Sequence, residues 1–426
     1  MTSVGSTLLL SAEEQLEIIK RGTAEIISEA DLLAKLREGR PLRAKYGVDA
    51  SGPDITLGHV VPIRKLREMQ ELGHQAVLIV GDFTGMIGDP AERSETRRQL
   101  TREEVERNMA TYREQLFKVL DPDRTEFRYN SEWLGALTSE QIIHLAASHT
   151  VAQMLSREDF ANRFQTNESI GVHEFLYPLL QGYDSVAVRS DIELGGTEQK
   201  FSFLVARELQ RHNPLGESQP PQVILTMPIL VGLDGVQRMG KSLHNYIGIS
   251  EPPDEQFGKI MSIPDDCLVQ YYELCTSVPS EEIATMRRDM EAGRLNPRDA
   301  KMRLAEEIVR TYHGEEAGRT AVRHWEEVFV SGAPVTDEIA DQAATRLPAD
   351  RRGAKVWAAT ALVEAGLAPS KTEARRMILA GSAYYRLPGS AAEVQITDPE
   401  AEIALEEGLF LRVGKRRMAK ITFAEQ

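Results

Sequence analysis

The chain has 426 residues, 42% of them hydrophobic, and a formal net charge of −15 at pH 7. This length predicts two or three domains, each with ample core material. The acidic balance excludes a protein that binds nucleic acid over its whole surface, so any RNA contact must come from a local basic patch.

The two cysteines, Cys267 and Cys275, show no spacing typical of a zinc site or of a disulfide framework. The N-terminus lacks a signal-peptide pattern, and no apolar run approaches the roughly 18 residues that a membrane span needs. We therefore expect a cytoplasmic protein with no membrane partner.

Residues 42–72 are predicted to form a strand, a turn-rich loop and an amphipathic helix. The strand is expected at 42–48, and Pro62 is expected in the first turn of the helix. Gly58 and His59 would then lie at the helix N-terminus, where free amides and the helix dipole favour an anion. A phosphate ligand is the first hypothesis, and an ordinary helix cap is the alternative.

Two further strands are expected to end beside glycines and polar residues. The continuous apolar run at 75–81 is typical of a strand covered on both faces, and it leads into the glycine-containing segment 81–90. That segment is neither a dinucleotide fingerprint nor a P-loop. The second strand, at 192–194, leads into Gly-Gly-Thr-Glu-Gln at 195–199. Arginines at 93, 97 and 98 could meet a polyphosphate or could form a solvated helix face.

Tyr177, Gln181 and Asp184 fall at i, i+4 and i+7, so they share one face of a predicted helix. Such a stripe is either a satisfied buried network or the wall of a binding site. A strand expected at 185–188 would place Asp184 near the sheet, which favours the binding wall.

The second element of the site lies far along the chain. Arg238-Met239-Gly240-Lys241-Ser242 follows a predicted strand at 223–231 and a turn at 233–235. With Thr56-Leu57-Gly58-His59, this segment resembles the paired "HIGH" and "KMSKS" elements of class I aminoacyl-tRNA synthetases. In order and spacing, segments 49–59, 81–90, 177–184, 195–199 and 238–242 resemble those of the bacterial tyrosyl-tRNA synthetase family over nearly the whole chain. The tryptophanyl enzymes share this core, but the polar face of 177–184 and the C-terminal region resemble the tyrosyl type more closely.

The resemblance implies an α/β fold with several parts. A Rossmann-like parallel-sheet catalytic domain at 1–247 would carry a helical insertion at about 100–175 that makes the dimer contact of an expected homodimer. An α-helical anticodon-stem domain at 248–330, a linker at 331–353 and a small α+β RNA-binding module at 354–426 would follow. A capping box of Ser370 and Glu373 is expected to open a helix of that module. Its basic residues either track tRNA phosphates or are solvated charges; they are Lys371, Arg375, Arg376, Lys415, Arg416 and Arg417.

The family's reaction implies L-tyrosine, ATP with Mg²⁺ and tRNA(Tyr) as substrates, with no tightly bound cofactor and no protein metal site. Its chemistry depends on positioning and charge stabilisation rather than on a strong base. The implied catalytic residues are Thr56, His59, Arg238 and Lys241. The implied ATP contacts are Gly47, Asp49, Ser51, Gly58, His59, Gly196, Glu198, Met239 and Lys241. The implied tyrosine contacts are Lys45, Thr84, Asp89, Tyr177, Gln181, Asp184 and Gln199.

The chain departs from the family pattern mainly on the ATP side. The departing residues are Thr56 for the first His of "HIGH", Ala50-Ser51 for Pro-Thr, Glu198 for the ribose Asp and Arg238 for the opening Lys of the mobile loop. Lys45 also stands where one branch of the family has a second phenol-binding tyrosine. Two alternatives stay open: a duplicated enzyme that serves inhibitor resistance or activates a tyrosine analogue, and an RNA-binding scaffold that has lost activation. The presence of His59, Lys241, Asp89 and Asp184 argues against the scaffold.

Overall fold

A computed structural model describes residues 10–49, 54–90, 101–327, 344–390, 392–414 and 417–424. Several residues of the sequence predictions lie outside these ranges: Ala50, Ser51, Arg93, Arg97, Arg98, Lys415 and Arg416. The chain divides into two compact units at Gly318/Arg319, and each unit is described here by itself.

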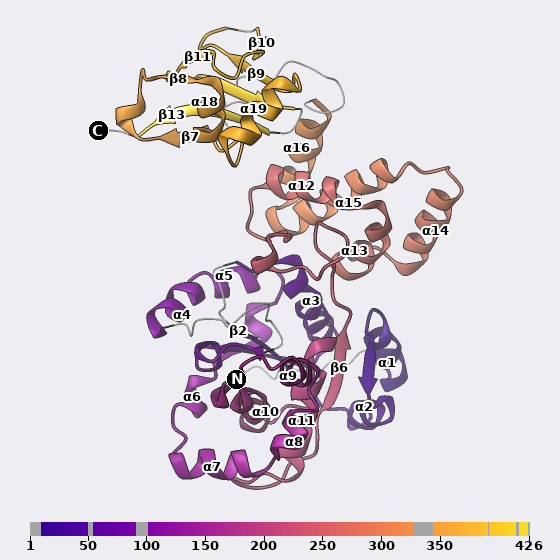
Figure 1. Cartoon of the computed structure of the whole chain (residues 1–426). Helices are drawn as coiled ribbons and strands as arrows, with labels where there is room; N and C mark the ends of the chain where they lie inside the picture. Colours follow the sequence, from indigo (N-terminus) through magenta and orange to yellow (C-terminus); the bar gives the residue numbers. More distant parts are fainter. Residues whose placement is uncertain are drawn as a thin grey trace. The chain divides into compact units, whose positions relative to one another are not determined.

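The first unit is built on a six-stranded sheet (Figure 1). In spatial order its strands are β1 (Glu25–Ile27), β6 (Val223–Met227), β5 (Ile192–Gly196), β2 (Arg43–Asp49), β3 (Gln75–Gly81) and β4 (Thr125–Tyr129). The β1/β6 pair is antiparallel, and the other neighbouring pairs are parallel. The chain leaves β2 in one direction, to β3 and β4, and returns on its other side at β5. The carboxyl ends of β2 and β5 therefore flank the crevice where such sheets bind ligands.

Helices connect and cover these strands. Those of the sheet region are α1 (Ala12–Lys20), α2 (Glu29–Leu36), α3 (Leu57–Glu71), α4 (Arg102–Met109), α5 (Tyr112–Leu116), α6 (Ser131–Leu134), α7 (Ser139–Ala147), α8 (Val151–Met154), α9 (Glu158–Gln165), α10 (Tyr177–Ala187) and α11 (Lys200–Arg211). Short 3₁₀ turns are η1 (Thr84–Met86), η3 (Pro122–Arg124), η4 (Val172–Leu176), η5 (Thr197–Gln199) and η6 (Lys241–Leu243). The predicted strand at 75–81 is confirmed, because its apolar residues are buried throughout.

The strand predicted at 185–188 is wrong. Helix α10 continues through Ala187 and ends where Arg189 takes a left-handed φ of 51°. The β-branched Val186 and Val188 suggest a strand locally, but both are buried, and α10 packs along α11. Tertiary packing therefore overrides the local preference, and Asp184 is held by a helix rather than by a helix-to-strand junction.

The position expected for Pro62 also needs correction. The N-cap of α3 is Thr56, so Pro62 is the sixth helical residue instead of a first-turn residue. Without an N–H, Pro62 cannot bond the Gly58 carbonyl in the usual i to i−4 pattern. Gly58 and His59 are nevertheless at the second and third helical positions, as the sequence predicts.

The remainder of the first unit is helical, with α12 (Pro253–Ser262), α13 (Leu268–Cys275), α14 (Ser280–Glu291), α15 (Pro297–His313) and the start of α16 (Glu315–Trp325). Helix α15 begins after Asn296, whose side chain accepts the N–H of Arg298, and Pro297 lies in its first turn. Helix α15 packs on α12 and α13, and α13 also packs on α3 of the sheet region. Within the first unit, the helical segment thus contacts the helix that begins beside the crevice.

The second unit contains β7 (Ala344–Leu347), η9 (Ala349–Arg351), β8 (Lys355–Trp357), α18 (Ala358–Glu364), α19 (Lys371–Leu379), β9 (Ala383–Arg386), β10 (Val394–Gln395), β11 (Glu402–Ala404), β12 (Phe410–Val413) and β13 (Arg417–Phe423). A five-stranded sheet has the order β10-β9-β12-β13-β7, and β11 pairs with β8. The helices and the larger sheet share one apolar core.

Two expectations for the second unit are corrected. Strand β7 pairs in parallel with β13, and Leu347 is buried in the core, so residues 344–347 belong to the module and not to a linker. Ser370 caps α19 through the N–H of Glu373, but the Glu373 carboxylate pairs with Arg376 at 2.7 Å. The reciprocal half of the predicted capping box is therefore missing, because the arginine competes for the carboxylate.

Candidate active site

A cavity lies at the carboxyl ends of the central strands, against the N-terminus of α3. Its lining includes most of the predicted site residues that the structure describes: Lys45, Gly47, Asp49, Gly58, His59, Thr84, Asp89, Tyr177, Gln181, Asp184, Gly196, Glu198, Gln199, Arg238 and Met239. Thr56 and Lys241 are not part of this lining. Segments far apart in the sequence thus converge on one cavity.

Two glycines shape the wall formed by β2 and β3. Gly47 lies in the middle of a central strand yet is exposed, and a Cβ there would meet nothing within 4 Å. A ligand can therefore approach the backbone of β2 at this point. At Gly81, by contrast, a Cβ would collide with the Asp49 carboxylate. The absence of a side chain at 81 thus lets Asp49 face the cavity.

Asp49 joins the nucleotide side of the cavity to the polar face of α10. Its Oδ2 accepts the hydroxyl of Tyr177 at 2.9 Å, and its Oδ1 accepts the hydroxyl of Thr84 at 2.8 Å. Tyr177 and Thr84, two predicted tyrosine contacts, are thus both hydrogen-bonded to Asp49, a predicted ATP contact. The two halves of the site are therefore connected through Asp49.

A second cluster presents acceptors suited to an ammonium. Asp89 accepts Arg157 at 2.8 Å and Gln199 Nε2 at 2.6 Å. Gln199 Oε1 in turn accepts Gln181 Nε2 at 3.1 Å. The other amide atom, Gln181 Oε1, is buried and receives no hydrogen bond from the described residues. A buried acceptor without a donor is costly, so this oxygen is suited to a cationic ligand group.

A carboxylate lies further along α10. Asp184 is 4% exposed; its Oδ1 accepts Trp133 Nε1 at 2.7 Å, and its Oδ2 accepts Asn130 Nδ2 at 3.3 Å. Burial raises the pKa of Asp184 to about 6, and the positive charge of Lys45 opposes this rise. At neutral pH the carboxylate is ionised and can accept a further hydrogen bond.

Lys45 does not have the role expected for it. Its Nζ donates to Glu193 Oε1 at 2.6 Å, to Ser185 Oγ at 2.8 Å and to the Gln181 carbonyl at 3.2 Å. An ammonium has three N–H donors, and these partners use all of them. The expectation that Lys45 hydrogen-bonds a substrate phenol is therefore not supported by its geometry.

His59 is held as a neutral donor. The backbone N–H of Thr56 donates to His59 Nδ1 at 3.3 Å, and Thr56 Oγ1 lies 2.7 Å from the same nitrogen. Since Nδ1 accepts, the proton of the neutral ring is on Nε2. Burial, with the nearby charges of Lys241 and Arg238, lowers the His59 pKa to about 3. Thr56 is itself fully buried, so it acts on the site through His59.

The predicted mobile loop carries its two basic residues in different environments. The Arg238 side chain lines the cavity and has no hydrogen-bond acceptor among the described residues. Lys241 Nζ instead donates to the Asp54 carbonyl at 3.0 Å and to the Tyr112 hydroxyl at 3.5 Å. Lys241 therefore contacts protein atoms outside the lining of the cavity.

Within the described ranges, no group of three or more His, Cys, Asp or Glu side chains could hold a metal ion. No helix in those ranges is long and apolar enough to cross a membrane. Cys267 and Cys275 are buried free thiols.

The predicted tRNA contacts in the second unit are partly engaged. Arg375 pairs with Glu400 at 2.6 Å, and Arg376 pairs with Glu373 on an exposed helix face. Lys371 is exposed, whereas Arg417, the first residue of β13, donates to the Leu367 carbonyl at 3.2 Å. If this surface binds RNA, Arg375 and Arg376 must leave their carboxylate partners to contact the RNA phosphates.

The sequence of the first unit matches a known family. Residues 37–330 match the class I tRNA synthetases of the tryptophanyl and tyrosyl group. The chain belongs to this family. Among curated relatives, the tyrosine–tRNA ligase of Moorella thermoacetica is 53% identical, covering 96% of this chain and 95% of its own length. "Tyrosine–tRNA ligase 2" of Vibrio vulnificus is 49% identical over 98% of this chain and all of its own length.

Solved structures show the same fold. The tyrosyl-tRNA synthetase of Archaeoglobus fulgidus, solved with L-tyrosine, has a TM-score of 0.59 and 24% identity over 73% of this chain and 99% of that one. A truncated mitochondrial tyrosyl-tRNA synthetase of Aspergillus nidulans has a TM-score of 0.61, covering 75% of this chain and 94% of that one at 22% identity. The predicted class I fold is confirmed.

Several site residues escaped the sequence predictions. Asn130 and Trp133 hold Asp184, Arg157 holds Asp89, and Glu193 holds Lys45. The first three lie in the helical insertion, where no local pattern marks them. Only Glu193 could have been noticed in the sequence, because a charged residue inside a buried strand indicates that an oppositely charged partner lies beside it.

Proposed function

We propose that the chain activates L-tyrosine with ATP and transfers the tyrosyl group to tRNA. The observation that carries this proposal is the face of α10, where one helix presents acceptors for both ends of tyrosine. Gln181 Oε1, with Asp89 near it, suits the ammonium, and the Asp184 carboxylate accepts the phenol hydrogen. Tyr177 and Thr84 complete the pocket through Asp49.

Activation forms tyrosyl-adenylate. A carboxylate oxygen of tyrosine attacks the α-phosphorus of ATP, the bond to the bridging oxygen breaks, and pyrophosphate leaves. A terminal ribose hydroxyl of tRNA(Tyr) then attacks the tyrosyl carbonyl, and AMP leaves. Both steps depend on alignment and on donors directed at developing negative charge. Mg²⁺ enters as part of the ATP complex.

The other half of the cavity suits the nucleotide. His59 Nε2–H is a neutral donor, and Arg238 supplies a positive charge within the cavity. Gly47, Gly58 and Gly196 line the cavity and would allow the nucleotide to approach the backbone, while Glu198 would meet the ribose and Met239 would be a further ATP contact. Lys241 reaches the phosphates after the loop moves. Donors of this kind, directed at developing charge, stabilise the transition state more than bound ATP.

The test is ATP–pyrophosphate exchange with each of the twenty amino acids, followed by charging of tRNA(Tyr). We expect exchange with tyrosine, and only weak exchange with phenylalanine. A preference for tryptophan would overturn the proposal, and a lack of exchange with every amino acid would support the RNA-binding scaffold instead. A preference for a tyrosine analogue would support the duplicated-enzyme alternative.

The insertion supports a homodimer. Four large apolar side chains there are more than 60% exposed: Ile143, Val151, Phe164 and Val172. Exposed apolar groups gathered in one segment are typical of an interface. The double variant Ile143→Asp/Phe164→Asp should run as a monomer in light scattering, whereas Leu379→Asp, an equally exposed position of the second unit, should not change the mass. A monomeric unmodified chain would refute the dimer.

The second unit is proposed to bind tRNA. A chain ending at Glu327 retains every described residue of the cavity and should still exchange pyrophosphate, but should charge tRNA poorly. Charging by the full chain should weaken steeply with salt, because Lys and Arg displace counterions from phosphates. Equal charging by the two chains would exclude the second unit as an RNA contact.

A further inference from the structure

The tyrosine pocket rests on a buried ion pair that the proposed reaction does not use. Lys45 of β2 and Glu193 of β5 are register partners on neighbouring parallel strands, and both side chains are 1% exposed. Ionised groups at this depth are expensive unless each is paired and hydrogen-bonded. Both conditions are met here, since Ser185 of α10 accepts from Lys45 and donates to Glu193 at 3.0 Å.

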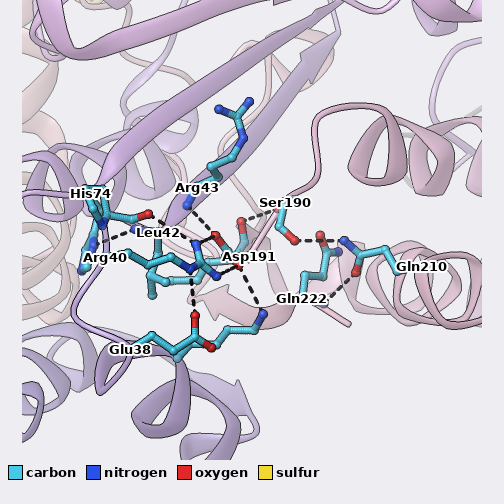
Figure 2. A network of polar contacts seen from close by, with 12 residues as sticks. Glu38, Arg40, Leu42, Arg43, His74, Ser190, Asp191, Gln210 and Gln222 are labelled. Atoms are coloured by element: carbon cyan, nitrogen blue, oxygen red, sulfur yellow. Dashed lines mark hydrogen bonds and ion pairs between the residues drawn. The ribbon is translucent and has the colours of Figure 1, made fainter. Parts of the chain in front are cut away.

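Glu193 is also held from the side away from the cavity. Gln222 Nε2 donates to Glu193 Oε2, and the Gln222 backbone N–H donates to Gln210 Oε1 at 2.6 Å. Gln210 Nε2 then donates to the Ser190 carbonyl at 2.9 Å (Figure 2). Ser190 adjoins Asp191, whose carboxylate is bound by Arg40, Lys35 and the Arg43 N–H, as Figure 2 also shows in part. The pair is therefore fixed by a continuous polar network through the sheet.

Lys45 lines the same cavity as Asp184, and its ammonium holds the carbonyl of Gln181, one turn before Asp184 on α10. Asp184 is hydrogen-bonded by the uncharged Asn130 and Trp133 from the segment around α6. The charged groups that act on its pKa are Lys45 from β2, which lowers it, and Glu193 from β5, which raises it. The cluster thus holds two carboxylates and a single ammonium. An ammonium at this position favours the ionised form of Asp184.

We propose that Lys45 sets the selectivity for tyrosine over phenylalanine without touching the substrate. Its charge keeps the Asp184 carboxylate ionised, and the ionised carboxylate accepts the phenol hydrogen. Lys45 is therefore a positioning residue that acts through Asp184. This inference rests on the proposed tyrosine-activating function, and it explains why a lysine can occupy the place of a second phenol-binding tyrosine.

The geometry excludes the simpler role of a direct contact. All three ammonium donors of Lys45 have protein acceptors, so a phenol at Asp184 would have to break one of them. Breaking the bond to Glu193 would leave a buried carboxylate without its cation, which is strongly unfavourable. The effect of Lys45 on the substrate is electrostatic.

The experiment measures kcat/KM for tyrosine and for phenylalanine in ATP–pyrophosphate exchange between pH 5 and 8.5. In the unmodified enzyme the tyrosine profile should fall on the acid side near pH 6, where Asp184 takes up a proton. Lys45→Met nearly keeps the side-chain length but removes the charge. The pH at which kcat/KM for tyrosine falls on the acid side should therefore rise by about one unit or more. At pH 7 a shift of one unit lowers the ionised fraction of Asp184 from about 0.9 to about 0.5. The ratio of kcat/KM for tyrosine to that for phenylalanine should therefore fall about twofold there, approaching about tenfold below pH 6, and should recover as the pH is raised.

Glu193→Gln should produce the opposite shift. It removes a negative charge that faces Asp184, so the acid limb should move to lower pH. Lys35→Met is the matched control, because Lys35 is also buried but pairs with Asp191 outside the cavity at 3.3 Å. The limb should not move in that variant.

Opposite shifts from removing opposite charges cannot arise from a general loss of packing. The inference is overturned if both variants keep the acid limb of the unmodified enzyme, or if Lys45→Met lowers tyrosine and phenylalanine activity equally at every pH. If Lys45→Met does not fold, the shift in Glu193→Gln decides alone. Failure of the proposed function is distinguishable, since the unmodified enzyme would then show no tyrosine-dependent exchange.

Discussion

The two halves of the cavity differ in how far their side chains are already fixed. In the amino-acid half, Asp184, Asp89 and Gln199 are held by bonds of 2.6–3.3 Å to other side chains. In the nucleotide half, Lys241 is bound to Asp54 and Tyr112 outside the lining, and Arg238 has no acceptor among the described residues. We infer that tyrosine meets a preformed pocket, whereas the phosphate contacts assemble when ATP binds.

The variant expected to have the largest effect separates the halves directly. Lys241→Ala should slow adenylate formation about 10²- to 10³-fold in single-turnover kinetics, because it removes a charged donor to the phosphates. The affinity for tyrosine, measured without ATP, should stay the same. Lys20→Ala, a surface lysine paired with Glu29, is the control. Equal loss of tyrosine affinity in Lys241→Ala would mean that the two halves are not independent.

The second test breaks the preformed half. Asp184→Ala should lower the ratio of kcat/KM for tyrosine to that for phenylalanine by about ten- to a hundredfold, the value of a hydrogen bond to a charged group. Phenylalanine activity should change little, since phenylalanine has no hydroxyl. An unchanged ratio would show that the phenol does not lie at Asp184.

A smaller effect is expected at Thr56, and here the structure changes the interpretation of the sequence. Thr56 was expected to be a catalytic residue, but its hydroxyl is buried against His59 Nδ1. Thr56→Val should therefore slow adenylate formation by about tenfold through a less firmly held imidazole, with substrate affinities nearly constant. Thr56→Ser, which keeps the hydroxyl, should restore the rate. If Thr56→Val forms adenylate as fast as the unmodified enzyme, the hydroxyl does not orient His59. The backbone N–H of Thr56 would then be sufficient to orient the ring.

The smallest expected effect concerns stability. An ionised Asp184 with a pKa of about 6 opposes folding above pH 6, since the unfolded carboxyl ionises more easily. Asp184→Asn should raise the free energy of unfolding by about 1–2 kcal/mol at pH 7.5 and the melting temperature by a few degrees. The gain should vanish below about pH 4, where both states bind the proton. A gain independent of pH would exclude ionisation as its cause.

The difference between the halves also explains what the sequence could predict. The strand at 75–81 follows from a local pattern, a continuous apolar run, and it is confirmed. The convergence of 47–49, 81–89 and 195–199 follows from strand ends meeting at one edge of a parallel sheet. These predictions need only local chemistry and topology.

The incorrect or missing predictions depend on tertiary contacts. Val186 and Val188 favoured a strand, but packing against α11 keeps this segment helical up to Ala187. Trp133 and Arg157 of the insertion hold two carboxylates of the cavity lining, and no local pattern shows which carboxylate each one binds. The partner of Lys45 becomes evident only when β2 and β5 are placed side by side.

We expect the amino-acid half to bind tyrosine before the nucleotide half assembles. Equilibrium binding of tyrosine and of phenylalanine in the absence of ATP tests it most directly, with the unmodified chain and Lys241→Ala side by side. We predict saturable tyrosine binding of equal affinity in both proteins, and phenylalanine binding at least tenfold weaker. Tyrosine binding that requires ATP, or equal affinity for the two amino acids, would contradict a preformed tyrosine pocket.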